Sequence, residues 1–243
     1  MARFHLPRAC WGPEAALTGD EARHLAQVLR LREGQRVTVF DGEGAYASAE
    51  IARVAKQRVD LRLGEICQSA ALRPVVTLAQ AVPKGKTMDW IVQKSVELGV
   101  AAIHPLITHH TVVQVGEDDA SKKQEKWQRV ALEACKQCGQ NFLPVVAEPR
   151  DFASWIAGAE EMAGVKLIAS LAPGARPFRE VLRGLPGVPD AVTLLIGPEG
   201  DFTTEETSAA LAAGFVPVTL GEIVLRVETA SLFGMSALRY EYA

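Results

Sequence analysis

Residues 191–202 read AVTLLIGPEGDF, an apolar run of strand length that ends in a turn with glycines at positions 197 and 200. Glycine allows backbone angles that are closed to other residues, and it lets a ligand approach the main chain. A helix is expected to follow, because Thr203 with Glu206, or else Thr204, suits a helix N-cap. Read alone, this turn is only a tight strand-to-helix connection. In an open α/β sheet, however, such turns at the carboxyl ends of strands bind the ligand.

The chain from Arg73 onward alternates apolar strand-like runs with helix-like runs. Strands are expected over residues 75–82, 100–106, 145–147, 166–171, 191–196 and 216–220. Helices are expected over residues 88–98, 121–139, 152–162, 178–182, 204–213 and 228–240. This alternation predicts an α/β fold with a mostly parallel sheet covered on both faces. We assign it to one domain, residues 73–243.

The first part of the chain, residues 1–70, has a different pattern. A helix is expected over residues 20–31, with Thr18 as its N-cap and Glu21 completing a capping box. Alternating strands follow over residues 35–40, 45–54 and 58–66, the first two joined by a glycine-rich hairpin turn at 41–44. Short strands joined by tight turns predict a small β-barrel domain.

The composition is that of a packed globular protein, with 48% hydrophobic and 23% charged residues in a chain of 243. A net charge of −3 excludes a strongly basic protein that covers nucleic acid through its overall positive charge. Any RNA contact must therefore come from a local basic patch. One short stretch is rich in arginine: it contains Arg23, Arg30, Arg32 and Arg36, with Glu33 as the acidic residue among them. This stretch is either an RNA-binding patch or an ordinary solvated surface.

No apolar run approaches the roughly 18 to 20 residues of a membrane span. The first residues, MARFHLPR, lack the apolar stretch of a signal peptide. We therefore expect a cytoplasmic protein without membrane contact.

A second loop stands out at residues 220–230, LGEIVLRVETA. Its apolar residues continue through the connection, which suits a flat uncharged ring such as adenine held by backbone groups. Arg226 and Glu228 flank the start of the last expected helix, where a surface ion pair is the alternative interpretation.

Together these two loops resemble the SPOUT-class methyltransferases, and more narrowly the ribosomal RNA small subunit methyltransferase E family. Four further segments share the resemblance, which runs nearly end to end along the chain: HLAQVLRL at 24–31, KGKTMDW at 84–90, QKSVELGV at 93–100 and ACKQCG at 134–139. The resemblance implies a trefoil-knotted methyltransferase domain, which is a rare exception to unknotted topology, after a PUA-like RNA-binding β-barrel. It also implies a homodimer that packs through the last helix.

The resemblance further implies a substrate and a cofactor. S-adenosyl-L-methionine would methylate N3 of one uridine in 16S rRNA, free or in the small ribosomal subunit, as a step of ribosome biogenesis. Arg226 is the expected catalytic cation, and Glu228 is the expected base with Glu199 behind it. The expected RNA contacts are Arg23, His24, Arg30, Arg32 and Arg36. The expected cofactor contacts are Leu171, Ile196, Gly197, Pro198, Glu199, Gly200, Leu220, Gly221, Leu225, Arg226 and Ala230.

The chain departs from the pattern of this family at several positions. Asp201 replaces the last glycine of G-P-E-G-G, and Gln140 and Ile223 stand where arginines are common. Thr108-His109-His110 replaces a Ser-Glu-Arg run. Two alternatives therefore stay open: methylation of another RNA by a related knotted enzyme, and a catalytically silent RNA-binding or assembly module.

No metal site is expected. Cys135 and Cys138 form a C-x-x-C inside a helix without a second pair, so a zinc site lacks ligands. His109 and His110 are adjacent in an expected extended segment and should face opposite ways. Three tryptophans are expected in the core rather than at a surface that stacks RNA bases: Trp90, Trp127 and Trp155.

Overall fold

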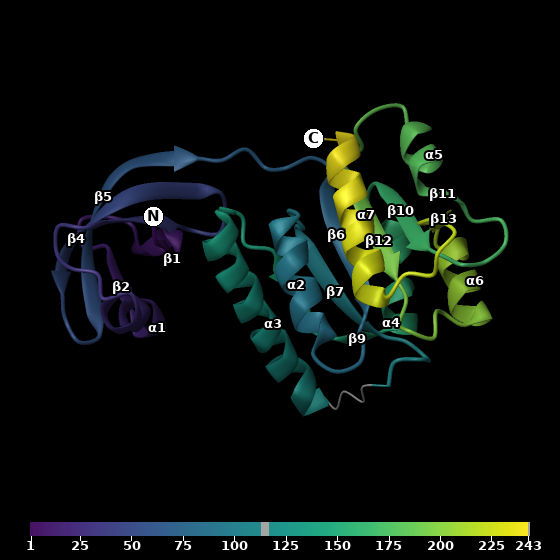
Figure 1. Cartoon of the computed structure of the whole chain (residues 1–243), viewed down its shortest axis with the longest axis horizontal. Coiled ribbons are helices and arrows are strands. Elements are labelled where there is room, and N and C mark those ends of the chain that lie inside the picture. Colours follow the sequence, from purple (N-terminus) through teal and green to yellow (C-terminus); the bar gives the residue numbers. More distant parts are fainter. Residues whose placement is uncertain (113–116, 243) are drawn as a thin grey trace. The chain divides into compact units, whose positions relative to one another are not determined.

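The computed structural model describes residues 1–112 and 117–242, and they form two compact units. Unit one comprises Met1–Ala71 with Leu132–Leu143, and unit two comprises Leu72–Ala131 with Pro144–Ala243. Each unit has its own sheet (Figure 1). Each also has its own cluster of buried apolar side chains.

Unit one is built on a five-stranded sheet in the order β1-β3-β4-β5-β2. Strand β1 runs parallel to β3, and the other neighbours are antiparallel. The strands are β1 (Arg3–His5), β2 (Ala16–Thr18), β3 (Arg36–Phe40), β4 (Ala45–Val54) and β5 (Arg58–Gln68). Alternate residues of β4 are buried over most of its length, as expected for a strand with one face on a core.

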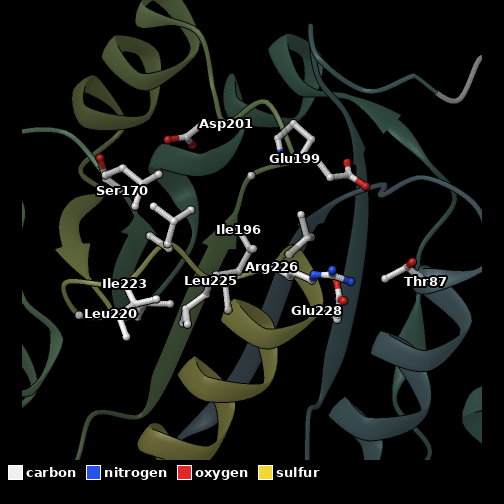
Figure 2. Close-up of a pocket in the computed structure, with 18 of the residues that line it drawn as sticks. Thr87, Ser170, Ile196, Glu199, Asp201, Leu220, Ile223, Leu225, Arg226 and Glu228 are labelled. Carbon is white, nitrogen blue, oxygen red and sulfur yellow. The ribbon is translucent and has the colours of Figure 1, made fainter.

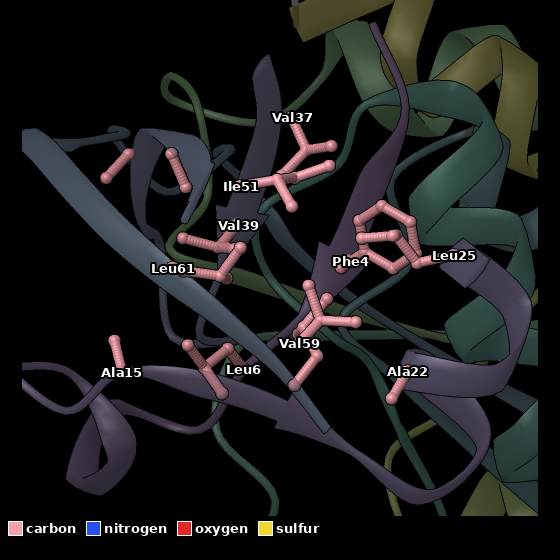
Figure 3. Packing of buried hydrophobic residues seen from close by; sticks show 13 residues of the cluster. Phe4, Leu6, Ala15, Ala22, Leu25, Val37, Val39, Ile51, Val59 and Leu61 are labelled. Atoms are coloured by element: carbon pink, nitrogen blue, oxygen red, sulfur yellow. The ribbon is translucent and has the colours of Figure 1, made fainter. Parts of the chain in front are cut away.

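The core of unit one gathers side chains from every strand of this sheet (Figure 3). Phe4 of β1, Leu25 of the helical segment and Ile51 of β4 are fully buried there. Val59 and Leu61 of β5 close the same cluster. The alternating strands expected from the sequence are therefore explained by one shared apolar face.

The helical segment of unit one is less regular than the sequence predicts. α1 (Gly19–Arg23) is followed by the π-helical turn η2 (His24–Val28), and a 3-10 turn, η1 (Arg8–Cys10), precedes β2. The predicted capping box at Thr18 is wrong, because the Thr18 side chain makes no capping bond. Glu21, its predicted second member, instead pairs with the ammonium of Lys136.

Unit two contains a parallel sheet of eight strands, in the order β11-β13-β10-β12-β6-β7-β8 with β9 also on β7. This confirms the predicted α/β class. The strands are β6 (Val75–Ala81), β7 (Ala102–Ile107), β8 (Val145–Val146), β9 (Arg150–Asp151), β10 (Val165–Ala169), β11 (Arg176–Pro177), β12 (Ala191–Ile196) and β13 (Val216–Thr219).

Both faces of this sheet are covered by helices, so the central strand β12 is buried throughout most of its length. Leu194 points toward α7, where a Cβ added to Gly234 would lie 2.5 Å from its Cδ2 atom. Leu195 belongs to the cluster on the α4 and α6 side, with Phe202 and Phe215. The helices are α2 (Thr87–Glu97), α3 (Glu117–Cys138), α4 (Phe152–Ile156), α5 (Phe178–Arg183), α6 (Thr204–Ala212) and α7 (Val227–Tyr242).

Two predictions need correction: the length of one helix and the burial of one tryptophan. The helix expected over residues 152–162 ends as α4 at Ile156, and only the 3-10 turn η3 (Ala159–Glu161) follows Gly158. Trp127 and Trp155 are buried as predicted, but Trp90 on α2 is 43% exposed and is not a core residue. Among the described residues, no helix is long and apolar enough to cross a membrane.

Candidate functional site

A cavity of about 490 Å³ opens at the carboxyl ends of the strands of unit two (Figure 2). This is the edge at which open parallel sheets bind ligands. Its lining residues are Lys84, Thr87, Ala169, Ser170, Leu171, Ile196, Gly197, Pro198, Glu199, Asp201, Leu220, Gly221, Ile223, Val224, Leu225, Arg226, Val227, Glu228 and Ala230.

The first wall of the cavity is the turn after β12. A Cβ added to Gly197 would lie 3.0 Å from the Asp201 Oδ1 atom and 3.1 Å from the Phe202 ring, so the turn packs tightly around this glycine. Thr203 then caps α6 through its hydroxyl, and Glu206 completes the capping box. The predicted cap at Thr203 is thereby confirmed.

The second wall is the loop after β13. Gly221, with φ 134°, donates its N–H to the Thr219 hydroxyl at 3.3 Å, and that hydroxyl donates to the Gly221 carbonyl at 3.0 Å. The apolar side chains that follow are largely solvated, with Ile223 79% and Val224 71% exposed. This loop therefore presents an uncovered apolar surface at the cavity.

The two glycine-bearing turns follow strands that are not neighbours in the sheet. Strand β10 lies between β12 and β13, and it pairs with both. Its end supplies Ala169, Ser170 and Leu171 as a third wall. The two turns nevertheless converge on one cavity because all three strands are parallel and end at the same edge.

A fourth segment, the loop between β6 and α2, brings Lys84 and Thr87 to the cavity. The Glu199 carboxylate accepts the backbone N–H of Lys84 at 3.0 Å, which ties this loop to the turn after β12. Lys84, Thr87 and Ser170 are site residues that were not predicted from the sequence. Lys84 and Thr87 lie in the segment 84–90 that shares the family resemblance, and Ser170 stands near the carboxyl end of an expected strand.

Arg226 and Glu228 line the cavity at the start of α7. Among the described residues, neither side chain forms an ion pair within 4 Å of an opposite charge, so the surface ion pair considered as an alternative is absent. The Arg226 carbonyl accepts the N–H of Ala230 at 2.8 Å in the first turn of α7. The guanidinium and the carboxylate are thus free to contact a bound molecule.

A buried polar pair fixes the start of α7 against the sheet. Ser231 and Gln80 have no exposed surface, and the Ser231 hydroxyl donates to the Gln80 side-chain oxygen. The Gln80 amide in turn donates to the Ala81 carbonyl at 2.9 Å. Hydrogen-bonded polar groups in a core fix the position of a helix on a sheet more narrowly than apolar packing alone. The backbone that carries Arg226 and Glu228 is therefore held rigidly.

The structure brings together most of the predicted site. Every predicted cofactor-binding residue except Gly200 lines the cavity. Gly200 instead faces His110, whose Cβ would lie 3.0 Å from a Cβ added to this glycine. Asp201, the residue that departs from the G-P-E-G-G pattern, lines the cavity with a left-handed φ of 58°.

The prediction that His109 and His110 face opposite ways is wrong. They lie in a turn rather than an extended strand, and their ring centroids are 5.0 Å apart. The His109 N–H donates to the Glu206 carboxylate at 2.8 Å, and the His110 ring bonds the Asp201 carbonyl at 2.9 Å. The described residues contain no group of three or more His, Cys, Asp or Glu side chains placed to hold a metal ion.

The two cysteines of the C-x-x-C motif differ in exposure. Cys135 is buried, and burial raises the pKa of its thiol to about 12, so the reactive thiolate is scarce at neutral pH. Cys138 is exposed. Cys135 is therefore a core residue, whereas Cys138 lies at the surface.

The predicted basic cluster lies on unit one. Arg23, Arg30, Arg32 and Arg36 are exposed, and only Arg23 forms an ion pair among the described residues, with Asp20 at 3.4 Å. His24 is half-buried, with its ring edge-on to Phe4 at 6.1 Å. The arginines are available to a polyanion, whereas His24 packs partly into the domain.

Comparisons with known proteins agree with this architecture. A family profile described as an RNA methyltransferase domain matches residues 71–239, and one described as an RNA methyltransferase PUA domain matches residues 17–64. The fold and the cavity are thus those of an RNA methyltransferase with a PUA domain.

Curated relatives narrow the class. Ribosomal RNA small subunit methyltransferase E of Synechocystis sp. is 34% identical over 91% of this chain and 71% of its own length. The Bacillus subtilis protein of that name is 29% identical over 94% of this chain and 91% of its own. The crystal structure of the Neisseria gonorrhoeae protein of that name, bound to S-adenosyl methionine, is 33% identical. It has a TM-score of 0.87 and covers 100% of this chain and 98% of that one. The chain belongs to the ribosomal RNA small subunit methyltransferase E family.

Proposed function

We propose that this chain transfers the methyl group of S-adenosyl-L-methionine to N3 of a uridine in 16S ribosomal RNA. The observation that carries the proposal is the cavity formed by the turns after β10, β12 and β13. Family membership supports the reaction class, and the cofactor is the one bound in the related structure from Neisseria gonorrhoeae.

The residues of the cavity fit this cofactor. Its volume of about 490 Å³ lies in the range of small-molecule sites, about 300 to 1,000 Å³. Leu171, Ile196 and Leu225 offer apolar surface to a flat adenine ring, beside backbone groups of the glycine turns. Asp201 and Glu199 offer carboxylates to the hydroxyl and ammonium groups of the cofactor. When bound, the cofactor supplies an electrophilic methyl group on a sulfonium.

The side chains at the start of α7 would then act on the uracil. N3 carries a proton between two carbonyl groups, and its lone pair becomes nucleophilic only when that proton leaves. The Arg226 guanidinium would stabilise the negative charge that develops on a neighbouring carbonyl oxygen. The Glu228 carboxylate would accept the N3 proton, with Glu199 as the second candidate for this role.

Unit one would deliver the RNA. We propose that residues 1–70 form the RNA-binding domain and residues 73–243 the catalytic domain, and that Arg23, Arg30, Arg32 and Arg36 hold phosphates. His24, being half-buried, would contact RNA only through its ring edge. The target base must be unpaired or flipped to reach a pocket.

We also propose the homodimer, the trefoil knot and the cytoplasmic location that the resemblance implies. Large apolar side chains on α2 and α7 support a partner surface, since Phe233 is 47%, Tyr240 85% and Trp90 43% exposed. Light scattering with Phe233→Glu tests the dimer: we expect the wild type at twice the mass of one chain and the variant at the mass of one chain.

Mapping N3-methyluridine in 16S rRNA tests the function directly. Ribosomal RNA from cells lacking the gene should miss one such nucleotide, and purified protein with cofactor should restore it on isolated RNA or small subunits. Calorimetry with S-adenosyl-L-methionine should show stoichiometric binding. A protein that binds RNA but no cofactor would be a silent assembly module, and a methyl group found in another RNA would overturn the substrate.

A further inference from the structure

A second cavity, of about 480 Å³, opens on unit one and is separate from the site described above. One wall is the segment that precedes β2, and the other is the second half of β5. We call it the β5 groove. Its lining residues are Arg8, Trp11, Gly12, Pro13, Leu61, Arg62, Leu63, Gly64 and Ile66.

The groove lies along the part of β5 that β2 does not pair with. β2 pairs with β5 only opposite residues 58–60, and the last link is the Leu61 N–H donating to the Ala15 carbonyl at 2.8 Å. Beyond Leu61, no strand of the described residues pairs with that edge of β5. Gly64 also lines this part of the groove.

Trp11 forms a rigid aromatic wall of the groove. Its indole N–H donates to the Leu6 carbonyl at 2.7 Å, which fixes the ring plane. The Arg8 guanidinium lies over the ring, 4.7 Å from its centroid. Proteins that bind single-stranded nucleic acids use both base stacking on aromatic side chains and cation–π contributions from arginine. Ile66, 47% exposed, adds apolar surface to the groove.

The opposite rim of the groove carries Arg62, whose side chain is 72% exposed. It pairs with Glu50 at 2.9 Å, a surface ion pair that contributes little in water and can exchange for a phosphate. The strand register places Arg36 opposite Glu50 and Glu50 opposite Arg62. Arg62 therefore stands in one cross-strand row with Arg36, a predicted RNA contact.

We propose that the β5 groove binds one nucleotide of a single-stranded RNA segment, with its base against Trp11 and its flanking phosphates on Arg8 and Arg62. The proposal rests on the proposed function, in which this chain acts on RNA. An acidic peptide could use the two arginines, but it has no use for the aromatic wall. The ring and the cations together therefore favour a nucleotide.

Fluorescence anisotropy of the full-length protein with a labelled single-stranded oligouridylate tests the groove. Trp11→Leu should weaken binding about tenfold, the loss expected for one stacked base. Arg62→Gln should weaken binding and reduce the slope of log affinity against log salt by about 0.7, the value for one phosphate on a single strand. Lys56→Gln, an exposed cation in the β4–β5 turn outside the groove, is the matched control and should change neither affinity nor slope by as much.

Wild-type affinity and slope in both groove variants would overturn the proposal. Arg62 is exposed, so Arg62→Gln keeps the test valid if Trp11→Leu fails to fold. Equal competition by polyglutamate and by the oligonucleotide would also overturn it, in favour of an acidic peptide. Cofactor binding and methyl transfer are measured on the same samples. If the wild type methylates RNA and both variants bind RNA as the wild type does, only the groove proposal is overturned. If the wild type binds no RNA, both proposals are overturned.

Discussion

The His110 imidazole bonds the backbone carbonyl of Asp201 at 2.9 Å, and Asp201 has the left-handed φ of 58°. A non-glycine residue in this region carries strain that the surroundings must offset. Aspartate tolerates it better than most residues, and here its Oδ1 atom also accepts the N–H of Phe202 at 2.8 Å. His110 therefore holds in place the residue that departs from the glycine of the family pattern.

The first prediction concerns this pair. His110→Ala should lower the free energy of unfolding by about 1 kcal/mol, because one hydrogen bond is lost. It should also weaken cofactor binding, since Asp201 lines the cavity. Thermal denaturation and calorimetry measure the two effects.

The same change in an Asp201→Gly background is the control. Glycine adopts the left-handed conformation without strain, so His110→Ala should then weaken cofactor binding less than it does in the wild type. Equal effects in both backgrounds would show that His110 acts independently of Asp201.

The second prediction concerns Arg226. Arg226→Gln removes the cation at the start of α7, and the single-turnover methylation rate should fall about 10² to 10³-fold, as for the loss of one charge-stabilising donor. Because α7 is fixed by the buried Ser231–Gln80 bond, the cofactor dissociation constant should change far less than the rate. An unchanged rate would remove Arg226 from the mechanism.

Much of this site follows from local sequence. The apolar run 191–196, the glycine turn and the Thr203–Glu206 capping box are all determined within the one segment 191–206, and each forms as predicted. The position of β10 between β12 and β13 could not be read in this way. Strand order depends on which apolar faces pack together over the whole domain, and no local spacing records it.

Long-range contacts explain the other errors. Glu21 fits a capping box by spacing, but the Lys136 ammonium, 115 residues away in sequence, captures its carboxylate. Lys84 reaches the site through a bond between its N–H and Glu199. Trp90 was expected in the core by its size, yet the α2 face that carries it is 43% exposed at this residue. The positions of Glu21 and Lys84 thus depend on partners that are distant in sequence.

The third prediction concerns Gly197. Gly197→Ala would place a methyl group about 3.0 to 3.2 Å from Asp201 and the Phe202 ring, so these side chains must shift to admit it. We expect a loss of stability of about 1 to 3 kcal/mol and a clear loss of cofactor affinity. Gly187→Ala is the matched control, since nothing lies within 4 Å of its added Cβ. Equal behaviour of the two variants in denaturation and calorimetry would contradict the close packing of the turn.

The fourth prediction is a pH dependence that comes from His104. The Trp155 indole N–H donates to its Nδ1 atom at 2.9 Å, so that nitrogen carries no proton. Burial, and then the charge of Arg150, lower the pKa of His104 below its ordinary value of 6.5. The unfolded chain therefore binds a proton that the folded chain refuses. The free energy of unfolding should fall as the pH drops below 6.5, and this loss should level off below the folded pKa.

His104→Asn isolates this effect, because the asparagine side-chain oxygen can accept the Trp155 N–H but does not titrate near neutral pH. Urea denaturation of both proteins between pH 8 and pH 5 should give curves that converge as the pH falls, since only the wild type loses the contribution of a neutral histidine. The contributions of all carboxylates and of the other histidines are common to both proteins, so they cancel in the difference between the two curves. If the two curves stay parallel across this range, His104 titrates alike in the folded and unfolded chains, and its buried bond to Trp155 does not resist protonation.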